Sequence, residues 1–276
     1  MNLREELDKD KVFALLGQVA DELGYECYVV GGWVRDLLLG RRSEDIDVVV
    51  VGSGIEMAKS VAKKFDNKCS LAVYKNFGTA QVKKGRLELE FVGARKESYH
   101  RESRKPIVED GTLDDDQKRR DFTVNAMAIC LNGGRFGELI DPFDGLEDLE
   151  KKLIRTPLDP EITFSDDPLR MIRAIRFATQ LGFEIVPESK ESIKRNADRL
   201  EILSRERIAE ELHKIMNSKR PSIGFSLLDE CELLPRILPC LSDLKGVETV
   251  DGKGHKDNFR HTLQVLDNVA DSSDNL

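Results

Sequence analysis

Long apolar runs, paired cysteines and an excess of positive charge are all missing from this 276-residue chain. No stretch approaches the ~18 consecutive apolar residues of a membrane-spanning helix, and the acidic, polar N-terminus is unlike a signal peptide. The five cysteines, at positions 27, 69, 130, 231 and 240, form no C-x-x-C pair, which argues against a disulfide framework or a zinc site. A formal net charge of −8 excludes a surface that is basic throughout, although it leaves room for a local basic groove. These absences predict a cytoplasmic globular protein with reduced cysteines and no membrane contact.

The most informative stretch, residues 29–51, reads as a strand, a glycine turn, a short helix and a second strand. Asp45 and Asp47 lie two apart on a run that continues as four valines, so in a strand both carboxylates point to one face. Neighbouring carboxylates repel each other and are tolerated mainly where a cation or a shared proton neutralises them. Because Mg²⁺ prefers such oxygen ligands together with substrate phosphates, the pair predicts a metal site. The alternative is a polar strand edge without a function.

The glycine turn between these strands adds groups that suit a phosphate. Gly31 and Gly32 interrupt the first strand where the backbone turns tightly or approaches a ligand. Backbone N–H groups of such a turn can donate to phosphate, and Arg35 supplies a charged clamp nearby.

With the arginine and the glycines included, the segments GGWVRDLLLG and EDIDVVVVG resemble the signature of the nucleotidyltransferase superfamily. The likeness is to the class II, bacterial-type group of CCA-adding enzymes and poly(A) polymerases, whose pattern is Gly-Gly-x-Val-Arg-Asp followed by Asp-x-Asp. A Rossmann dinucleotide site is disfavoured because the two glycines do not complete G-x-G-x-x-G.

The resemblance implies a third acidic residue on a neighbouring strand. Within EFVGAR, Glu90 is followed five residues later by Arg95, as in the family segment, so Glu90 is the candidate and Glu88 the alternative. The alternative is that both glutamates face solvent on an edge strand and have no function.

The segment RRDFTVNAMAI, residues 119–129, resembles the family's Arg-Arg-Asp-x-x-x-Asn-Ala motif. Two arginines beside an aspartate can hold a triphosphate and hydrogen-bond a ribose hydroxyl. The resemblance implies that Arg120 contacts the nucleotide and that Asp121 and Asn125 shape the ribose pocket. The alternative is that Arg120 and Asp121 form an ordinary surface ion pair, which would contribute little to stability.

A third segment, FSDDPLRMIRAIRFA, predicts a helix with an acidic N-terminus and resembles the family's Glu-Asp-x-x-Arg motif, with Asp166 in place of the glutamate. Asp167 and Arg170 are neighbours at three-residue spacing. Their acceptors and donors can read the Watson-Crick edge of a base, which in the family selects CTP and ATP. Arg173 and Arg176 would neutralise phosphate or RNA backbone. The alternative is a helix whose acids only favour the positive end of its dipole.

Composition also suggests where the chain divides. Residues 95–118 are rich in both charges, contain a proline and a glycine, and predict a long loop. The turn signals of LIDPFDGLEDL place a boundary that separates a catalytic head (1–143) from a helical neck (144–218), and a helical body follows (219–276).

The C-terminal segment KGHKDNFRHTLQVL resembles the opening of an HD-type phosphohydrolase domain. No His-Asp pair follows His255 and His261, so a metal site is not expected there. A truncated C-terminus is expected.

The resulting expectation is an α+β fold, with a small mixed sheet and helices in the head and helices thereafter. The implied activity is template-independent addition of C and A to the 3′ end of tRNA from CTP and ATP, with two Mg²⁺ ions and no protein partner. A poly(A) polymerase and an enzyme adding only CC or only A remain open. An inactive RNA-binding protein on the same scaffold is the alternative outside enzymes.

Overall fold

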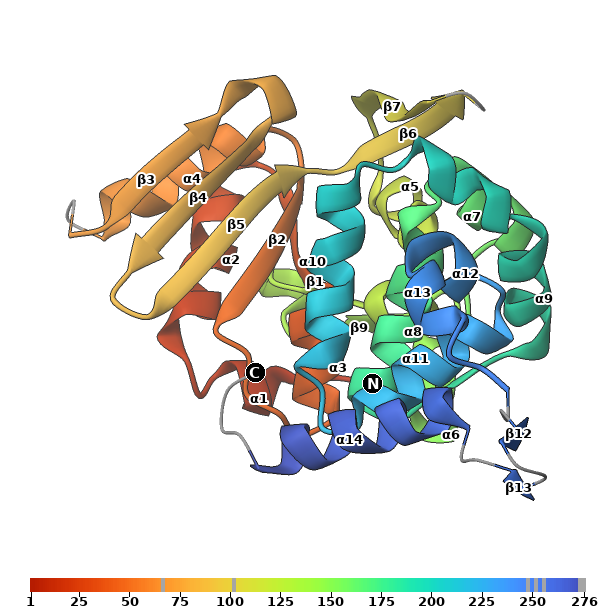
Figure 1. Cartoon of the computed structure of the whole chain (residues 1–276). Coiled ribbons are helices and arrows are strands. Elements are labelled where there is room, and N and C mark those ends of the chain that lie inside the picture. The colour runs from red at the N-terminus through yellow and green to blue at the C-terminus, as the bar shows by residue number, and fades with distance from the viewer. Residues whose placement is uncertain (66–67, 101–102, 247–248, 251–252, 255–256, 273–276) are drawn as a thin grey trace. The chain divides into compact units, whose positions relative to one another are not determined.

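The computed structural model describes residues 1–65, 68–100, 103–246, 249–250, 253–254 and 257–272 (Figure 1). It divides into two compact units. The head unit comprises residues 1–98 and 106–150, and the helical unit comprises residues 99–105 and 151–276. A further split of the helical part into neck and body stays a prediction.

The head unit is built on one seven-stranded sheet with the order β3-β4-β5-β2-β1-β8-β9. Its strands are β1 (Glu26–Val30), β2 (Asp45–Val51), β3 (Ser70–Tyr74), β4 (Thr79–Lys84), β5 (Leu87–Gly93), β8 (Ala128–Cys130) and β9 (Leu139–Ile140). Strands β2 and β5 are parallel, whereas the other neighbours in the sheet pair antiparallel. The mixed sheet agrees with the fold class expected from the sequence.

Helices and 3-10 turns of the head unit connect these strands. They are α1 (Arg4–Leu7), α2 (Lys11–Leu23), α3 (Gly32–Leu38), α4 (Gly54–Lys64), α5 (Leu113–Lys118), α6 (Gly145–Lys151), η1 (Lys75–Phe77), η2 (Thr123–Asn125) and η3 (Gly133–Arg135). Helix α2 begins after Asp10, whose side chain accepts from Val12 N–H. Gly24 ends α2 in the left-handed conformation, with a φ of 71°.

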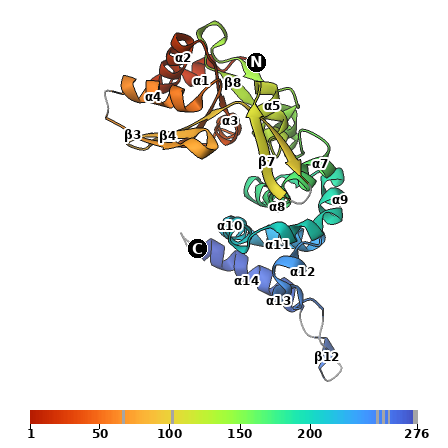
Figure 2. The ribbon, with the colours of Figure 1, turned by 90° about the horizontal axis from the view of Figure 1, so that it is seen from above.

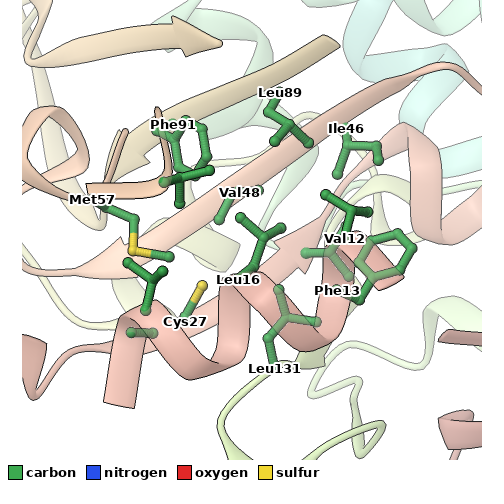
Figure 3. Packing of buried hydrophobic residues seen from close by; sticks show 14 of the residues in the cluster. Val12, Phe13, Leu16, Cys27, Ile46, Val48, Met57, Leu89, Phe91 and Leu131 are labelled. Atoms are coloured by element: carbon green, nitrogen blue, oxygen red, sulfur yellow. The ribbon is translucent and has the colours of Figure 1, made fainter. Parts of the chain in front are cut away.

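Helices α2 and α4 pack on one face of this sheet, and period-two alternation supplies the apolar contacts (Figure 3). Val48 of β2 and Phe91 of β5 are fully buried in this cluster, together with Leu16 of α2 and Met57 of α4. The same alternation turns Asp45, Asp47, Glu88 and Glu90 toward the opposite face. Strand geometry therefore separates an apolar core from an acidic surface.

The segment expected to be a long loop is instead structured, so that prediction is wrong. It forms β6 (Arg95–His100) and β7 (Ser103–Asp110), which pair with each other, and then α5. Gly111 N–H donates to Ala94 O at 3.0 Å and closes the base of this hairpin. Thr112 and Asp115 form a capping box that starts α5. The segment forms regular structure although it has few apolar residues, because backbone hydrogen bonds between strands and helix capping do not require apolar side chains.

The helical unit contains the remaining elements, which are mostly helices, as expected. They are α7 (Pro160–Asp166), α8 (Leu169–Leu181), α9 (Pro187–Arg195), η4 (Ala197–Ile202), α10 (Arg205–Met216), α11 (Pro221–Glu230), α12 (Leu234–Ile237), α13 (Pro239–Ser242), α14 (Asn258–Ser272), β10 (Leu153–Ile154), β11 (Glu184–Ile185), β12 (Thr249–Val250) and β13 (Lys253–Gly254). Helix α8 packs against α10 and α11, and α11 packs against α14 (Figure 2). The short strands β10 and β11 pair in parallel.

His255 lies outside the described residues, and His261 lies on α14. None of the helices in the described ranges has the length and apolar character needed to cross a bilayer.

Candidate active site

Two parallel strands bring four carboxylates to the open face of the head sheet. Along the β2–β5 pair, Asp45 is opposite Glu88 and Asp47 is opposite Glu90. Asp47 also lies opposite Val30, the last residue of β1, so the glycine turn after β1 begins beside it. Residues far apart in sequence thus meet at one end of the central strands.

The two glutamates differ in what surrounds them. Glu88 Oε2 forms an ion pair with Lys83 Nζ at 2.9 Å, and Gln81 donates a hydrogen bond to its other oxygen. Partial burial raises the pKa of Glu90, and the negative charge of Asp47 raises it further. The third carboxylate that faces the aspartates without a neutralising lysine is therefore Glu90.

Asp47 is held in an environment that opposes its charge. Its side chain reaches solvent, yet the loss of water around the carboxyl group raises its pKa. The nearby Arg120 guanidinium lowers the pKa, whereas Asp45 and Asp116 raise it. The net result is a carboxyl whose ionised form lacks full compensation within the protein.

This donor set fits a hard divalent cation. Among the described residues, no group of three or more His, Cys, Asp or Glu side chains converges closely enough to hold an ion by itself. Mg²⁺ typically takes one or two protein carboxylates and completes its shell with water and substrate phosphates. Asp45 and Asp47 supply those carboxylates on one strand face, where their mutual repulsion favours a bound cation.

The glycine turn is required because it lies between two charged groups. Gly31 has a φ of 74°, which favours glycine. A β-carbon at this position would lie 3.1 Å from Arg120 Nη1 and 3.4 Å from Asp47 Oδ2. The absence of a side chain thus lets the arginine and the carboxylate approach each other across the turn.

Arg35, expected to clamp phosphate, is buried and engaged with protein groups. Its Nη1 donates to Asn125 Oδ1 at 2.8 Å, and its Nε donates to Asp36 Oδ1 at 2.9 Å. Asn125 Nδ2 in turn donates to Asp121 Oδ1 at 3.0 Å. The structure therefore joins three predicted site residues in one hydrogen-bonded chain, in which Arg35 fixes the Asn125 amide. Contact of Arg35 with phosphate stays a prediction.

Asp116 is a residue of this site that the sequence reasoning missed. It is 0% exposed on α5 and accepts hydrogen bonds from both Arg119 and Arg120. Burial alone would raise the pKa of Asp116, but the Arg120 and Arg119 guanidiniums outweigh it and hold that pKa below its ordinary value. The signal was present, because the two arginines follow it at the i+3 and i+4 spacing of helical neighbours.

The expected base-reading residues belong to the helical unit. Asp167 lies at the break between α7 and α8, where its Oδ1 accepts from Leu169 N–H at 3.2 Å. Arg170, in the first turn of α8, is 9% exposed. The single helix expected across this segment is therefore two helices, and Asp167 precedes the second one.

The two arginines farther along α8 lie in different surroundings. The Arg173 and Arg176 guanidiniums lie 5.4 Å and 4.2 Å from the centre of the Phe177 ring. Arg176 is buried and forms an ion pair with Glu211 of α10 at 2.8 Å. Since that pair joins α8 to α10, Arg176 has a packing role, and its contact with phosphate or RNA stays a prediction.

A surface pocket of about 580 Å³ on the head unit contains none of the predicted site residues. It is lined in part by Phe13, Trp33 and Ile46. Because Ile46 packs with the core on the helix-covered side of the sheet, this pocket opens away from Asp47. Carboxylate geometry, and not cavity volume, marks the candidate site.

Comparison with known proteins shows the family of the chain. The sequence pattern of the "Poly A polymerase head domain" matches residues 27–155, and that of the "Probable RNA and SrmB- binding site of polymerase A" matches residues 182–245. The chain belongs to the class II tRNA nucleotidyltransferase and poly(A) polymerase family. The resemblance drawn from the sequence is thereby confirmed. Enzymes of this family are metal-dependent.

Individual members of the family differ in the nucleotides they add. The chain is 46% identical over 167 residues to an A-adding tRNA nucleotidyltransferase of Aquifex aeolicus, covering 60% of this chain and 20% of that protein. It is 35% identical over 264 residues to a CCA-adding enzyme of a Geobacillus species, covering 92% of this chain and 63% of that enzyme. The chain thus spans between a fifth and about two thirds of the length of these relatives.

A solved structure of a tRNA nucleotidyltransferase, complexed with a primer tRNA and an incoming ATP analogue, is similar with a TM-score of 0.71. The two chains are 38% identical, and the match covers 81% of this chain and 62% of the other. The fold class expected from the sequence is confirmed by this likeness.

Proposed function

We propose that this chain adds nucleotides to the 3′ end of tRNA without a template. The terminal 3′-hydroxyl attacks the α-phosphate of CTP or ATP, a new phosphodiester bond forms, and the bond to pyrophosphate breaks. The observation that carries this proposal is the exposed pair Asp45 and Asp47 on one face of β2, with Glu90 opposite Asp47 and Arg120 beside it. The substrates named for the solved relative support tRNA and nucleoside triphosphates as the reactants.

Asp45 and Asp47 would hold two Mg²⁺ ions. Bound there, the ions would lower the pKa of the attacking hydroxyl and neutralise charge on the leaving pyrophosphate. Glu90 assists as a further ligand or as a base for the hydroxyl proton. Burial and the charge of Asp47 raise the pKa of Glu90, which makes it a stronger base than an ordinary glutamate.

Other residues of the head unit would bind the nucleotide. Arg120 contacts the triphosphate, together with backbone N–H groups of Gly31 and Gly32 and with Arg35. Asp121 and Asn125, joined by a hydrogen bond, present a carboxylate and an amide to the ribose.

Base choice is assigned to the helical unit. Cytosine and adenine both carry an exocyclic amine, from which Asp167 would accept a hydrogen bond. Arg170 would donate to ring nitrogens and carbonyls. Arg173 and Arg176 would add positive charge for phosphate or RNA backbone. In this proposal residues 1–143 form the catalytic head, 144–218 the base-selecting neck and 219–276 the body.

An enzyme that adds only the terminal A is a second candidate. The 46% identity with an A-adding relative favours it, against 35% with the CCA-adding one, although the first match covers less of this chain. The two candidates share the site and differ in the tRNA ends that they extend.

The decisive experiment incubates the chain with tRNAs ending before CCA, after C and after CC, with each NTP separately and with CTP and ATP together, and sequences the products. Extension of all three ends to CCA supports the first proposal, and extension only of the CC end by A supports the second. A long A tail would assign poly(A) polymerase activity. Binding of tRNA without incorporation would leave an inactive RNA-binding protein.

Nucleotide choice has its own test in Arg170→Ala. Removing the guanidinium should reduce discrimination against UTP and GTP by about 10-fold, because one or two base-edge hydrogen bonds are lost. Arg195→Ala is the matched control, since Arg195 is an exposed arginine of α9 that pairs with Glu161. Unchanged discrimination in Arg170→Ala would remove this residue from base recognition.

A further inference from the structure

The buried Asp116 carboxylate is divided between two arginines. Its Oδ1 accepts from Arg119 Nε at 2.9 Å, and its Oδ2 accepts from Arg120 Nε at 3.1 Å and from Nη2 at 2.9 Å. Because Nε and Nη2 of Arg120 both donate to this one oxygen, that edge of the guanidinium is turned toward Asp116. Asp116 therefore determines where the remaining nitrogen of Arg120 points.

That remaining nitrogen, Arg120 Nη1, points to the glycine turn. It donates a long hydrogen bond of 3.4 Å to Asn125 O, and it lies 3.1 Å from the place that a β-carbon of residue 31 would take. Asp47 Oδ2 lies 3.4 Å from that same place. The guanidinium and the proposed metal ligand Asp47 are thus close neighbours with opposite charge, and the firm hydrogen bonds of Arg120 go to Asp116.

Arg119 ties the same anchor to the base of the β6–β7 hairpin. Arg119 Nη1 lies 3.3 Å from Glu97 Oε1 on β6, and Arg95 Nε lies 2.8 Å from that oxygen. The Glu97 side chain is 4% exposed. Charges therefore alternate in sign from Arg95 through Glu97, Arg119 and Asp116 to Arg120.

We propose that Asp116 is a positioning residue that keeps Arg120 from pairing with Asp47, so that Arg120 is held for the triphosphate and Asp47 for the cation. This inference rests on the proposed function. Without the Asp116 carboxylate, the Asp47 carboxylate is an acidic partner available to Arg120 across the turn. An Arg120–Asp47 ion pair would occupy both groups, and the site would lose anion binding and cation binding together. A residue that only stabilised α5 would not couple these two affinities.

The test measures binding by calorimetry, with Mn²⁺ alone and with inorganic triphosphate alone, in the full chain. Asp116→Asn keeps size and removes charge, and it should weaken triphosphate binding by about 10-fold and Mn²⁺ binding several-fold. Asp114→Asn is the matched control, because Asp114 lies on the same helix, is exposed and pairs with Lys118. Its two affinities should stay within about twofold of the parent protein.

A double-mutant cycle separates positioning from general damage. If Asp116 acts through Arg120, Asp116→Asn should cause no further loss of Mn²⁺ affinity in an Arg120→Ala background. An equal loss in both backgrounds would overturn the inference, as would Asp116→Asn affinities that match Asp114→Asn.

Arg120→Lys keeps the test decisive if Asp116→Asn does not fold. Lysine retains the charge but cannot make the two-nitrogen contact with Asp116, so triphosphate binding should again weaken about 10-fold. Binding within twofold of the parent protein would overturn the orientation argument. If the parent chain bound neither probe and incorporated no nucleotide, both the proposed function and this inference would be refuted. If the parent chain bound both probes and the variants bound them equally well, this inference alone would be refuted.

Discussion

Strand β2 has two faces that differ most at its N-terminal end, because Val49, farther along the acidic side, is buried as well. On the face covered by α2 and α4, Ile46 is 4% exposed and Val48 and Val50 are fully buried. On the other face Asp45 and Asp47 are exposed, and Asp47 has a raised pKa. Each fully buried aliphatic side chain contributes roughly 1.5–3 kcal/mol, so the apolar face offsets the repulsion on the acidic one. A site with uncompensated charge persists because the buried apolar side chains on the opposite face hold the same strand in place.

The largest effect should come from breaking the acidic face. Asp47→Ala removes a metal ligand, so nucleotide incorporation should fall on the order of a thousandfold or more while the fold survives. Incorporation of labelled CTP and ATP into tRNA measures the activity, and circular dichroism measures the fold. Glu44→Ala, an exposed acid just before β2, is the control and should retain activity. Unchanged turnover in Asp47→Ala would refute the metal assignment.

The apolar face should respond in stability instead of chemistry. Phe91→Ala removes a fully buried ring from the core behind the site and should lower the free energy of unfolding by about 3–5 kcal/mol. Urea denaturation provides the measurement. Val92→Ala, a half-buried neighbour on the other face of β5, should cost less. Equal costs would mean that the two faces are not energetically distinct.

The comparison is sharpened by the two glutamates on β5. Glu90→Gln should lower kcat by about 100-fold, because it removes a carboxylate next to Asp47 that serves as ligand or base. Glu88→Gln should have a smaller effect, since Glu88 is already paired with Lys83. Steady-state kinetics of both variants decide the assignment, and a larger loss in Glu88→Gln would reverse it.

Much of this contrast could be predicted from the sequence because it follows from a local period. Alternation along residues 45–51 assigns Asp45 and Asp47 to one face whatever the rest of the fold does. The parallel pairing of Asp47 with Glu90 is a tertiary fact, and for Glu90 the family resemblance supplied what local pattern could not.

Other features depended on contacts that no local pattern contains. The burial of Arg35 against Asn125 joins residues 90 positions apart, so a phosphate clamp looked equally reasonable from sequence. The β6–β7 hairpin was mistaken for a loop because it contains few apolar residues. Asp116 was the avoidable omission, since its spacing to Arg119 and Arg120 is a standard helical one.

The smallest expected effect concerns the stability of the acidic face itself. The raised pKa of Asp47 means that the folded protein disfavours the ionised form, so a stability penalty is present above the folded pKa and disappears below the pKa of the unfolded chain. Without divalent ions, Asp47→Asn should therefore melt at a higher temperature than the parent protein at neutral pH, by much less than Phe91→Ala lowers it. The gain should shrink as pH falls through the raised pKa. Added Mg²⁺ should stabilise only the parent and narrow the difference. Melting curves in chelator at neutral and acidic pH test this, and a variant that melts lower at neutral pH would show that Asp47 is compensated within the fold.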